Sequence, residues 1–418
     1  MESEPTHSLV MNTPYAVALF LLVLLVGAGF AFDGGESGGG GGTAPAATPV
    51  DEKSAPVATI AARVERIRGL RFETRPRPAE VSPAQAKRDG LEDLDRSYPV
   101  KERRADEEVL KLLGLLEPSV DLRKVSATVF GEGVAGYYDP RTKRLRIVKG
   151  AQTTNRFLEE ITLAHELTHA LEDQRFGLDL EDTSGSDDAD LARLALVEGS
   201  ATAVMLTYGE RHFSADQSIA GLFASLGQDT GDLPPFIEAQ LLFPYLGGQA
   251  FVQRLFATGA DSWKVVNAAD RFRPPASTEQ VLHPDKYLAV EQPLRVRRLG
   301  VAGALGEGGG WRRVAAGTWG EWATGKLLGN AGSAEGWGGD RYELWQQPTE
   351  NCQAPCRQRD ALVMRWRWDT RGDAREFETA LREWLPRQPG PSAVAASGRD
   401  VTLALAPDAA LARRLARG

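Results

Sequence analysis

Cysteine and histidine are scarce in this sequence. Only two of the 418 residues are cysteines, Cys352 and Cys356, and five are histidines. Two cysteines exclude a zinc site built from four thiolates. Because only three residues separate them, they could close a short disulfide loop if this part of the chain lies outside the cytoplasm, the alternative being two free thiols. No internal repeat is visible.

The sequence also lacks a block of basic residues. The net charge is −8 and the isoelectric point is about 5.4, and this acidic balance argues against a nucleic acid as partner. Hydrophobic residues make up 42% of the chain and charged residues 25%, as in an ordinary globular protein. The length allows two folded units after the N-terminal segments.

One long apolar run stands near the N-terminus, at residues 15–32 (YAVALFLLVLLVGAGFAF). It is just long enough to cross a bilayer. Residues 1–14 form an N-terminal tail with no Lys or Arg, and the run ends without a good cleavage site. These features favour an uncleaved transmembrane anchor over a signal peptide that is removed on secretion. No cysteine follows closely, which excludes a lipoprotein anchor.

Residues 33–54 are rich in Gly and then in Pro and Ala, which predicts a flexible linker. The nearest positive charge after the apolar run is Lys53, too distant to set the membrane orientation. A span followed by a linker indicates a globular domain held near a membrane. We expect that domain on the outer side of the membrane, because the two cysteines would suit a disulfide.

The rest of the chain divides into three regions. Residues 55–120 show helical patterns at 57–70 and 107–116 and predict a helical support or a pro-segment. Within 121–292, the runs SATVF, GVAGYY and RLRIV predict short strands, and helices are expected at 154–174 and after Ser186, whose side chain suits a helix cap. From 293 to 418 the pattern predicts a smaller α+β region.

The segment His165-Glu-Leu-Thr-His169 has the spacing of a metal-binding helix. Residues four apart project from the same side of a helix, so His165 and His169 can present their imidazoles to one ion. Glu166 would lie close enough to a metal-activated water to accept its proton. The alternative is two histidines that make ordinary hydrogen bonds on a packed helix.

A catalytic zinc ion commonly has three protein ligands, so a third must come from elsewhere in the chain. His212 and His283 are candidates, but Glu198 is preferred because it falls inside an apolar helical stripe. A buried carboxylate there would cost several kcal/mol if it were left unpaired. The alternative is a Glu198 that is paired with a buried arginine or with the backbone. The stripe consists of Leu191, Leu194, Ala195, Thr202 and Met205.

HELTH followed about 30 residues later by LVEGSAT resembles the gluzincin class of zinc peptidases. The sequence is most similar to a group of poorly characterised bacterial metallopeptidases, in GYYDP, HELTHALEDQ, LVEGSAT and PPASTEQVLHPDKY, which span roughly residues 120–290, and also in GWGGDRY at 336–342. The resemblance implies an α+β, zincin-like fold. In it a small sheet packs on the motif helix, the second half is mostly helical, and a helix brings the Glu198 ligand.

The sequence departs from thermolysin-like enzymes after Glu198. Those enzymes place an aspartate four residues further on, where it orients a zinc-binding histidine, and this chain has Thr202. Asp173, one turn after His169, is a candidate substitute, the alternative being a solvated helix charge. Outer groups of this kind tune metal affinity.

Two further residues are candidates for contact with the substrate. His283 and Tyr287 could donate a hydrogen bond to a developing oxyanion, although His283 is as well explained as a turn residue. By the resemblance, the strand near 133–138 would bind an extended peptide along its edge, while its tyrosines are better explained by packing.

These features predict a membrane-tethered zinc metallopeptidase that acts on peptide or protein substrates and binds one zinc ion. His165, His169 and Glu198 would be the ligands and Glu166 the general base. The alternative is a non-catalytic envelope binding or assembly module on the same fold. The presence of Glu166 beside the ligands favours the enzyme, because a structural metal site needs no base. Hydrolysis of a non-peptide amide is a third option.

Overall fold

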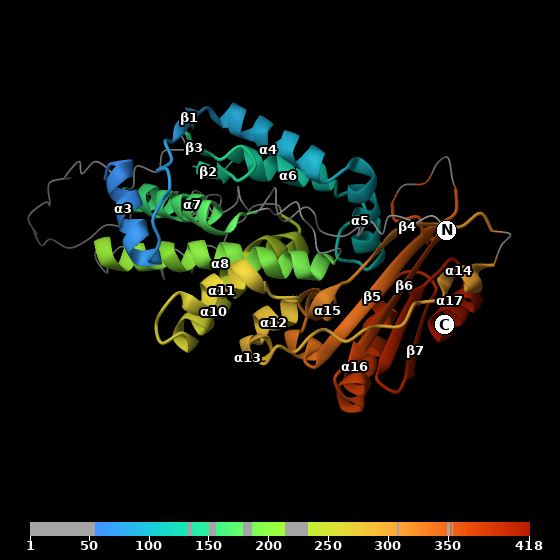
Figure 1. Cartoon of the computed structure of the whole chain (residues 1–418). Helices are drawn as coiled ribbons and strands as arrows, with labels where there is room; N and C mark the ends of the chain where they lie inside the picture. The colour runs from blue at the N-terminus through green and yellow to red at the C-terminus, as the bar shows by residue number, and fades with distance from the viewer. Residues whose placement is uncertain are drawn as a thin grey trace, which may run out of the picture.

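The computed structural model describes residues 55–132, 136–149, 156–178, 186–213, 233–306, 309–348, 352 and 354–418. Its fold is α+β, with one small and one larger sheet (Figure 1). The predicted anchor at 15–32 and the linker at 33–54 lie outside the described residues. Within them, no helix combines the length and apolar character that a bilayer crossing requires.

Four helices lie within residues 57–132, and one of them stands where a strand was predicted. They are α3 (Val57–Arg68), α4 (Pro83–Ser97), α5 (Val100–Leu112) and α6 (Leu122–Glu132). The prediction of a strand at SATVF was wrong, because these residues lie inside α6. Leu122, Ser126 and Phe130 are buried at helical spacing, and Phe130 packs directly against Gly90 of α4. Tertiary packing therefore overrides the strand preference of the β-branched residues.

The small sheet has the strand order β1-β3-β2, formed by β1 (Ala79–Val81), β2 (Gly136–Asp139) and β3 (Arg144–Val148). β1 is parallel to β3, and β2 is antiparallel to it. Asp139 closes the β2–β3 turn by accepting hydrogen bonds from the backbone N–H groups of Arg141 and Thr142. Strands β1 and β2 are the two edges of the sheet, and β2 lies beside the motif helix α7 (Arg156–Phe176).

Three long helices form the centre of the molecule: α7, α8 (Asp187–His212) and α10 (Pro235–Thr258). Helix α8 packs between the other two (Figure 1). Ser186 caps α8 by accepting a hydrogen bond from the N–H of Ala189, as its sequence position predicts. Helices α8 and α10 cross in close contact, since a Cβ atom on Gly248 would lie within 1.9 Å of the carbonyl oxygen of Ala195.

The C-terminal region is built on a five-stranded antiparallel sheet with the order β4-β5-β6-β8-β7. In β6, alternate residues face two separate hydrophobic clusters: Met364 and Trp366 face α16, whereas Ala361 and Val363 face α17. Helices thus cover both faces of the sheet. The strands are β4 (Arg312–Gly317), β5 (Trp337–Gln346), β6 (Asp360–Trp368), β7 (Ser392–Ser397) and β8 (Asp400–Leu405), and the two helices are α16 (Arg371–Trp384) and α17 (Ala409–Arg417).

Short helices connect the central helices to this sheet. They are α11 (Lys264–Phe272), α12 (Thr278–Leu282), α13 (Pro284–Leu288) and α14 (Val301–Leu305). Within the C-terminal region, α15 (Gly320–Leu328) and the 3-10 turn η3 (Ala331–Ala334) lie between β4 and β5, and the 3-10 turn η4 (Leu385–Arg387) follows α16.

A buried ion pair fastens α3 to the motif helix. The side chain of Arg68 is fully buried, and its Nε lies 2.5 Å from Oε1 of Glu172 on α7. The same guanidinium donates to Asn267 on α11 at 2.6 Å and lies 4.3 Å from the ring of Trp263. Residues 55–68 are therefore integrated into the central helices and support them.

We predict that Arg68→Met lowers the free energy of unfolding by about 3–5 kcal/mol, because it leaves the buried Glu172 carboxylate without its cation. Arg66→Met is the matched control, since Arg66 is exposed on the same helix, and it should change stability by less than about 0.5 kcal/mol. Urea denaturation measures both, and equal losses in the two variants would contradict this account.

Candidate metal centre

The motif helix α7 presents His165, Glu166 and His169 in the interior of the molecule. Each of these side chains is at most 2% exposed. Helix α7 is buried on several sides, since α3, α8 and β2 all pack on it. The spacing of four residues brings the Nε2 atoms of His165 and His169 within 2.9 Å of each other.

Glu198 of α8 completes this group. Its Oε2 lies 3.1 Å from Nε2 of His165 and 3.4 Å from Nε2 of His169, and its side chain is fully buried. The neighbouring Gly199 is required for this approach, because a Cβ atom there would come within 2.2 Å of the backbone of Gly248. The crossing of α8 and α10 therefore holds Glu198 against the two histidines.

The three ligand atoms fit a zinc ion. Imidazole nitrogens and carboxylate oxygens are atom types that commonly bind zinc in proteins, and the ligand atoms lie about 3.4 Å apart around a tetrahedral ion. Here they lie 2.9, 3.1 and 3.4 Å apart. Oε1 of Glu198, and Nδ1 of each histidine, are buried and have no hydrogen-bond partner within the described part of the chain. The donor set thus suits one metal cation.

The protonation states of His165, His169 and Glu198 depend on one another. Burial lowers the pKa of His165 to about 4, and His169 contributes to this shift. Burial opposes the charged form of His169 as well, but the Glu198 carboxylate raises the pKa of His169 to about 9. Burial alone would raise the pKa of Glu198, yet His169 and His165 hold it at about 2. Glu198 therefore requires a positive charge beside it.

Glu166 is positioned by the edge strand. Its Oε2 accepts a hydrogen bond of 2.8 Å from the backbone N–H of Tyr138 on β2. Burial raises the pKa of Glu166 to about 8. A carboxyl group with a pKa near neutrality can take up and release a proton at physiological pH.

Asp173 and Thr202, the residues predicted to support the metal ligands, make no hydrogen bond to either histidine of the motif. Asp173 accepts hydrogen bonds from the hydroxyl of Tyr138 and the N–H of Leu178, and it pairs with Lys143 at 2.8 Å. It is therefore neither a solvated charge nor hydrogen-bonded to a histidine of the motif. Thr202 is fully buried, and its Oγ1 has no partner among the described residues.

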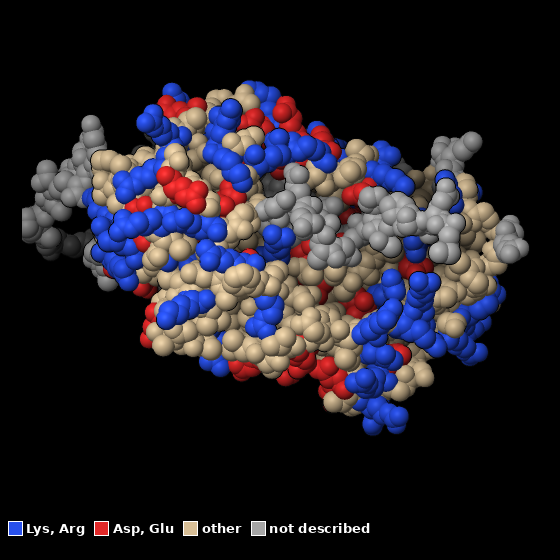
Figure 2. Space-filling view, viewed as in Figure 1, with Lys and Arg blue, Asp and Glu red and all other residues tan. Residues whose placement is uncertain are grey.

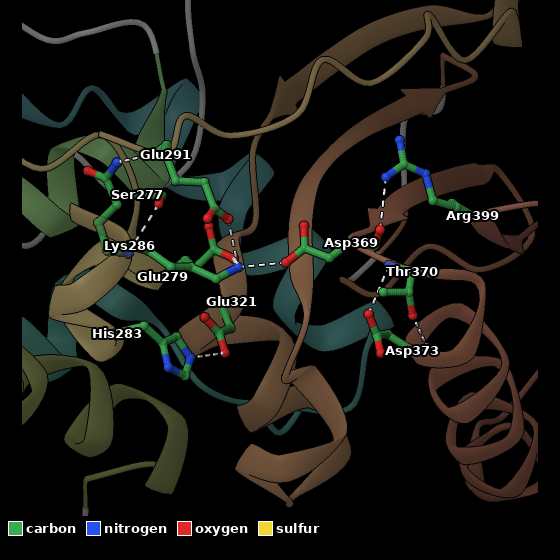
Figure 3. A network of polar contacts seen from close by, with 11 residues as sticks. Ser277, Glu279, His283, Lys286, Glu291, Glu321, Asp369, Thr370, Asp373 and Arg399 are labelled. Atoms are coloured by element: carbon green, nitrogen blue, oxygen red, sulfur yellow. Dashed lines mark hydrogen bonds and ion pairs between the residues drawn. The ribbon is translucent and has the colours of Figure 1, made fainter. Parts of the chain in front are cut away.

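His283 and Tyr287 take part in other contacts. Nε2 of His283 lies 2.8 Å from Oε1 of Glu321 (Figure 3), and the hydroxyl of Tyr287 donates to the carbonyl of Arg273 at 2.8 Å. Near His283, Lys286 lies 2.6 Å from both Glu279 and Asp369 and so joins α13 to the end of β6. His283 and Lys286 thus link the central helices to the C-terminal region, whereas Tyr287 contacts the segment after α11.

Tyr245 of α10 lies beside His165, although the sequence analysis did not identify it as a candidate site residue. It is 1% exposed, and its ring centroid lies 6.0 Å from that of His165. An aromatic residue within an apolar helical run shows no pattern that separates a site residue from a core residue. Only the α8–α10 crossing reveals its position.

Cys352 and Cys356 form a disulfide bond in the structure. The N–H of Cys356 donates to Glu108 of α5 at 2.6 Å, so the loop that the disulfide closes rests on the N-terminal helical region. Cys356, Glu108 and Asp360 lie close together, but a sulfur atom in a disulfide is not a thiolate ligand.

The comparison with family models found one match. Residues 311–416 match a family described as "Domain of unknown function (DUF8575)", which corresponds to β4 to β8 and their helices, up to the last residue but one of α17. No curated protein and no solved structure matches the chain. The matched segment lies entirely after His165, His169 and Glu198.

We predict that His169→Ala and Glu198→Gln each abolish stoichiometric zinc binding, because either change removes one of three converging ligand atoms. His283→Ala should retain zinc, since its imidazole faces Glu321. Elemental analysis of the purified full chain measures the zinc content. If zinc persisted in Glu198→Gln but was lost in His283→Ala, the metal would be bound near His283 and not by His165, His169 and Glu198.

Proposed function

We propose that this chain is a zinc-dependent metallopeptidase that is held to a membrane by residues 15–32 and acts on the outer side. The observation that supports the proposal is the convergence of His165, His169 and Glu198 on one point, with Glu166 beside them. The comparisons name no function for the matched C-terminal segment, so the proposal rests on these four residues.

The residues divide the chemistry between them. His165, His169 and Glu198 would hold one zinc ion, and zinc supplies Lewis-acid chemistry that lowers the pKa of water and polarises a carbonyl group. Glu166 would accept the proton of the attacking water and pass it to the leaving amine. The N–H of Tyr138 holds Oε2 of Glu166 and leaves its other oxygen for the proton.

Strand β2 would bind the substrate backbone. It is the edge strand of the small sheet that lies beside α7, and its Tyr138 N–H faces Glu166. An extended peptide can add to such an edge through backbone hydrogen bonds. The hydroxyls of Tyr137 and Tyr138 donate to Asp89 and Asp173, so these tyrosines shape the strand and leave recognition to the backbone.

The burial of all four side chains favours a second candidate function, a non-catalytic envelope binding or assembly module with a structural metal. A structural site needs no base, however, and the buried Glu166 makes no ion pair with Lys or Arg among the described residues. We therefore prefer the enzyme. Hydrolysis of a non-peptide amide would use the same residues.

We predict that Glu166→Gln keeps stoichiometric zinc but lowers kcat/KM by about 10²–10⁴-fold, because an amide cannot accept the proton of the water. Glu159→Gln is the matched control, an exposed glutamate on the same helix, and it should keep activity. Cleavage of a fluorogenic peptide library by the full chain provides the measurement.

Two outcomes would contradict the enzyme. Full activity in Glu166→Gln would exclude this residue as the base. Stoichiometric zinc in the native chain, with no cleavage of any peptide or amide in the library, would favour the non-catalytic module.

A further inference from the structure

An exposed phenylalanine stands at the surface where α3, α7 and α11 end. Phe272, the last residue of α11, is 80% exposed, more than any other large hydrophobic residue in the described part of the chain. Its neighbours Val266 and Ala269 on the same helix are buried. The helix is thus anchored through its inner face, while Phe272 projects into solvent.

Arginines lie on each of the three segments that meet here: Arg71 and Arg75 in the loop after α3, Arg175 near the end of α7, and Arg271 on α11. We call Phe272 with Arg71, Arg75, Arg175 and Arg271 the Phe272 surface. The guanidinium of Arg271 lies 5.0 Å from the ring of Phe176, which follows Arg175 at the end of α7. The loop after α3 lies against the same end of α7, through Gln174, which accepts hydrogen bonds from the N–H groups of Glu73 and Thr74.

The Phe272 surface carries excess positive charge. Arg75 pairs with Glu65 and Arg175 pairs with Glu73, whereas Arg71 and Arg271 make no ion pair with any described residue. Asp270, the nearest acidic residue in sequence, points inward to the buried Arg68 at 3.4 Å. Lys and Arg side chains gather on the side of the molecule where α3 and α7 lie (Figure 2).

An exposed aromatic ring flanked by unpaired arginines has the chemistry of a membrane-interface contact. The ring can enter the boundary between headgroups and acyl chains while the arginines attract anionic lipids. A nucleic acid fits less well, because the chain has a net charge of −8 and an extended basic groove is what a nucleic acid backbone needs.

The N-terminal segments bring a bilayer within reach. The 22-residue linker at 33–54 has an r.m.s. span of about 25 Å if it is flexible, and helix α3 begins soon after it, with the N–H of Ala55 bound to Glu160. A tether of this length holds its two ends at an effective concentration on the order of millimolar. A weak surface contact is therefore enough to orient the domain.

We propose that the Phe272 surface docks on an anionic lipid bilayer and fixes the orientation of the anchored domain. This proposal rests on the anchor at residues 15–32 and is independent of zinc binding and of hydrolysis. It assigns the exposed Phe272 and the unpaired Arg71 and Arg271 to lipid contact.

The test places an environment-sensitive fluorophore (NBD) on Phe272→Cys in the full chain, with the native disulfide intact, reconstituted in nanodiscs. Phosphatidylcholine alone is compared with phosphatidylcholine plus phosphatidylglycerol. We expect a blue shift of the emission only with phosphatidylglycerol, reduced by high salt and lost when Arg71→Gln and Arg271→Gln are added. Val290→Cys is the matched control, since Val290 is 53% exposed beside the acidic residue Glu291, and it should show no shift.

Three results would overturn the proposal. The emission from position 272 could be the same in both lipids, position 290 could shift equally, or RNA in place of anionic lipid could produce the shift. Unchanged zinc content and circular dichroism in the arginine variants show that they are folded, so a lost shift then reports the contact itself.

Discussion

The fully buried carboxylate of Glu198 is the constraint around which the central helices are arranged. A carboxylate without water costs several kcal/mol unless positive charge or hydrogen-bond donors replace the solvent. In this protein the replacement comes from α7, whose His165 and His169 both face Glu198. For this contact α8 must pack directly against the middle turns of α7. The close α8–α10 crossing at Gly199 and Gly248 presses α8 into that position.

Helix α7 has to satisfy buried polar groups on more than one side. One side carries the histidines and Glu166, while Glu172, three residues beyond His169, meets Arg68 of α3 and Ser200 of α8. A helix with polar contacts on several sides has no simple apolar stripe. The N-terminal helix α3 thus contributes a cation that the motif helix needs, which explains why residues 55–68 are integrated into the same core.

The central helices and the C-terminal sheet region are joined by polar contacts as well as by apolar packing. Lys286 of α13 bridges Glu279 of α12 and Asp369 at the end of β6 (Figure 3). A second contact joins His283, at the start of α13, to Glu321 of α15. The segment VLHPDKY at 281–287 therefore connects the central helices to the C-terminal region through His283 and Lys286, while the Tyr287 hydroxyl is bound by the carbonyl of Arg273.

The sequence by itself determined the local features: the helix that carries His165, Glu166 and His169, the cap at Ser186, and the choice of Glu198 from its apolar stripe. These follow from spacing along one helix, which short-range geometry governs. Only the tertiary structure decided that SATVF is helical, that Asp173 binds Tyr138, and that Tyr245 lies beside His165. The arginines around Phe272 likewise come from segments far apart in the chain. Such features depend on which elements meet in space, and residue spacing within one element carries no information about that.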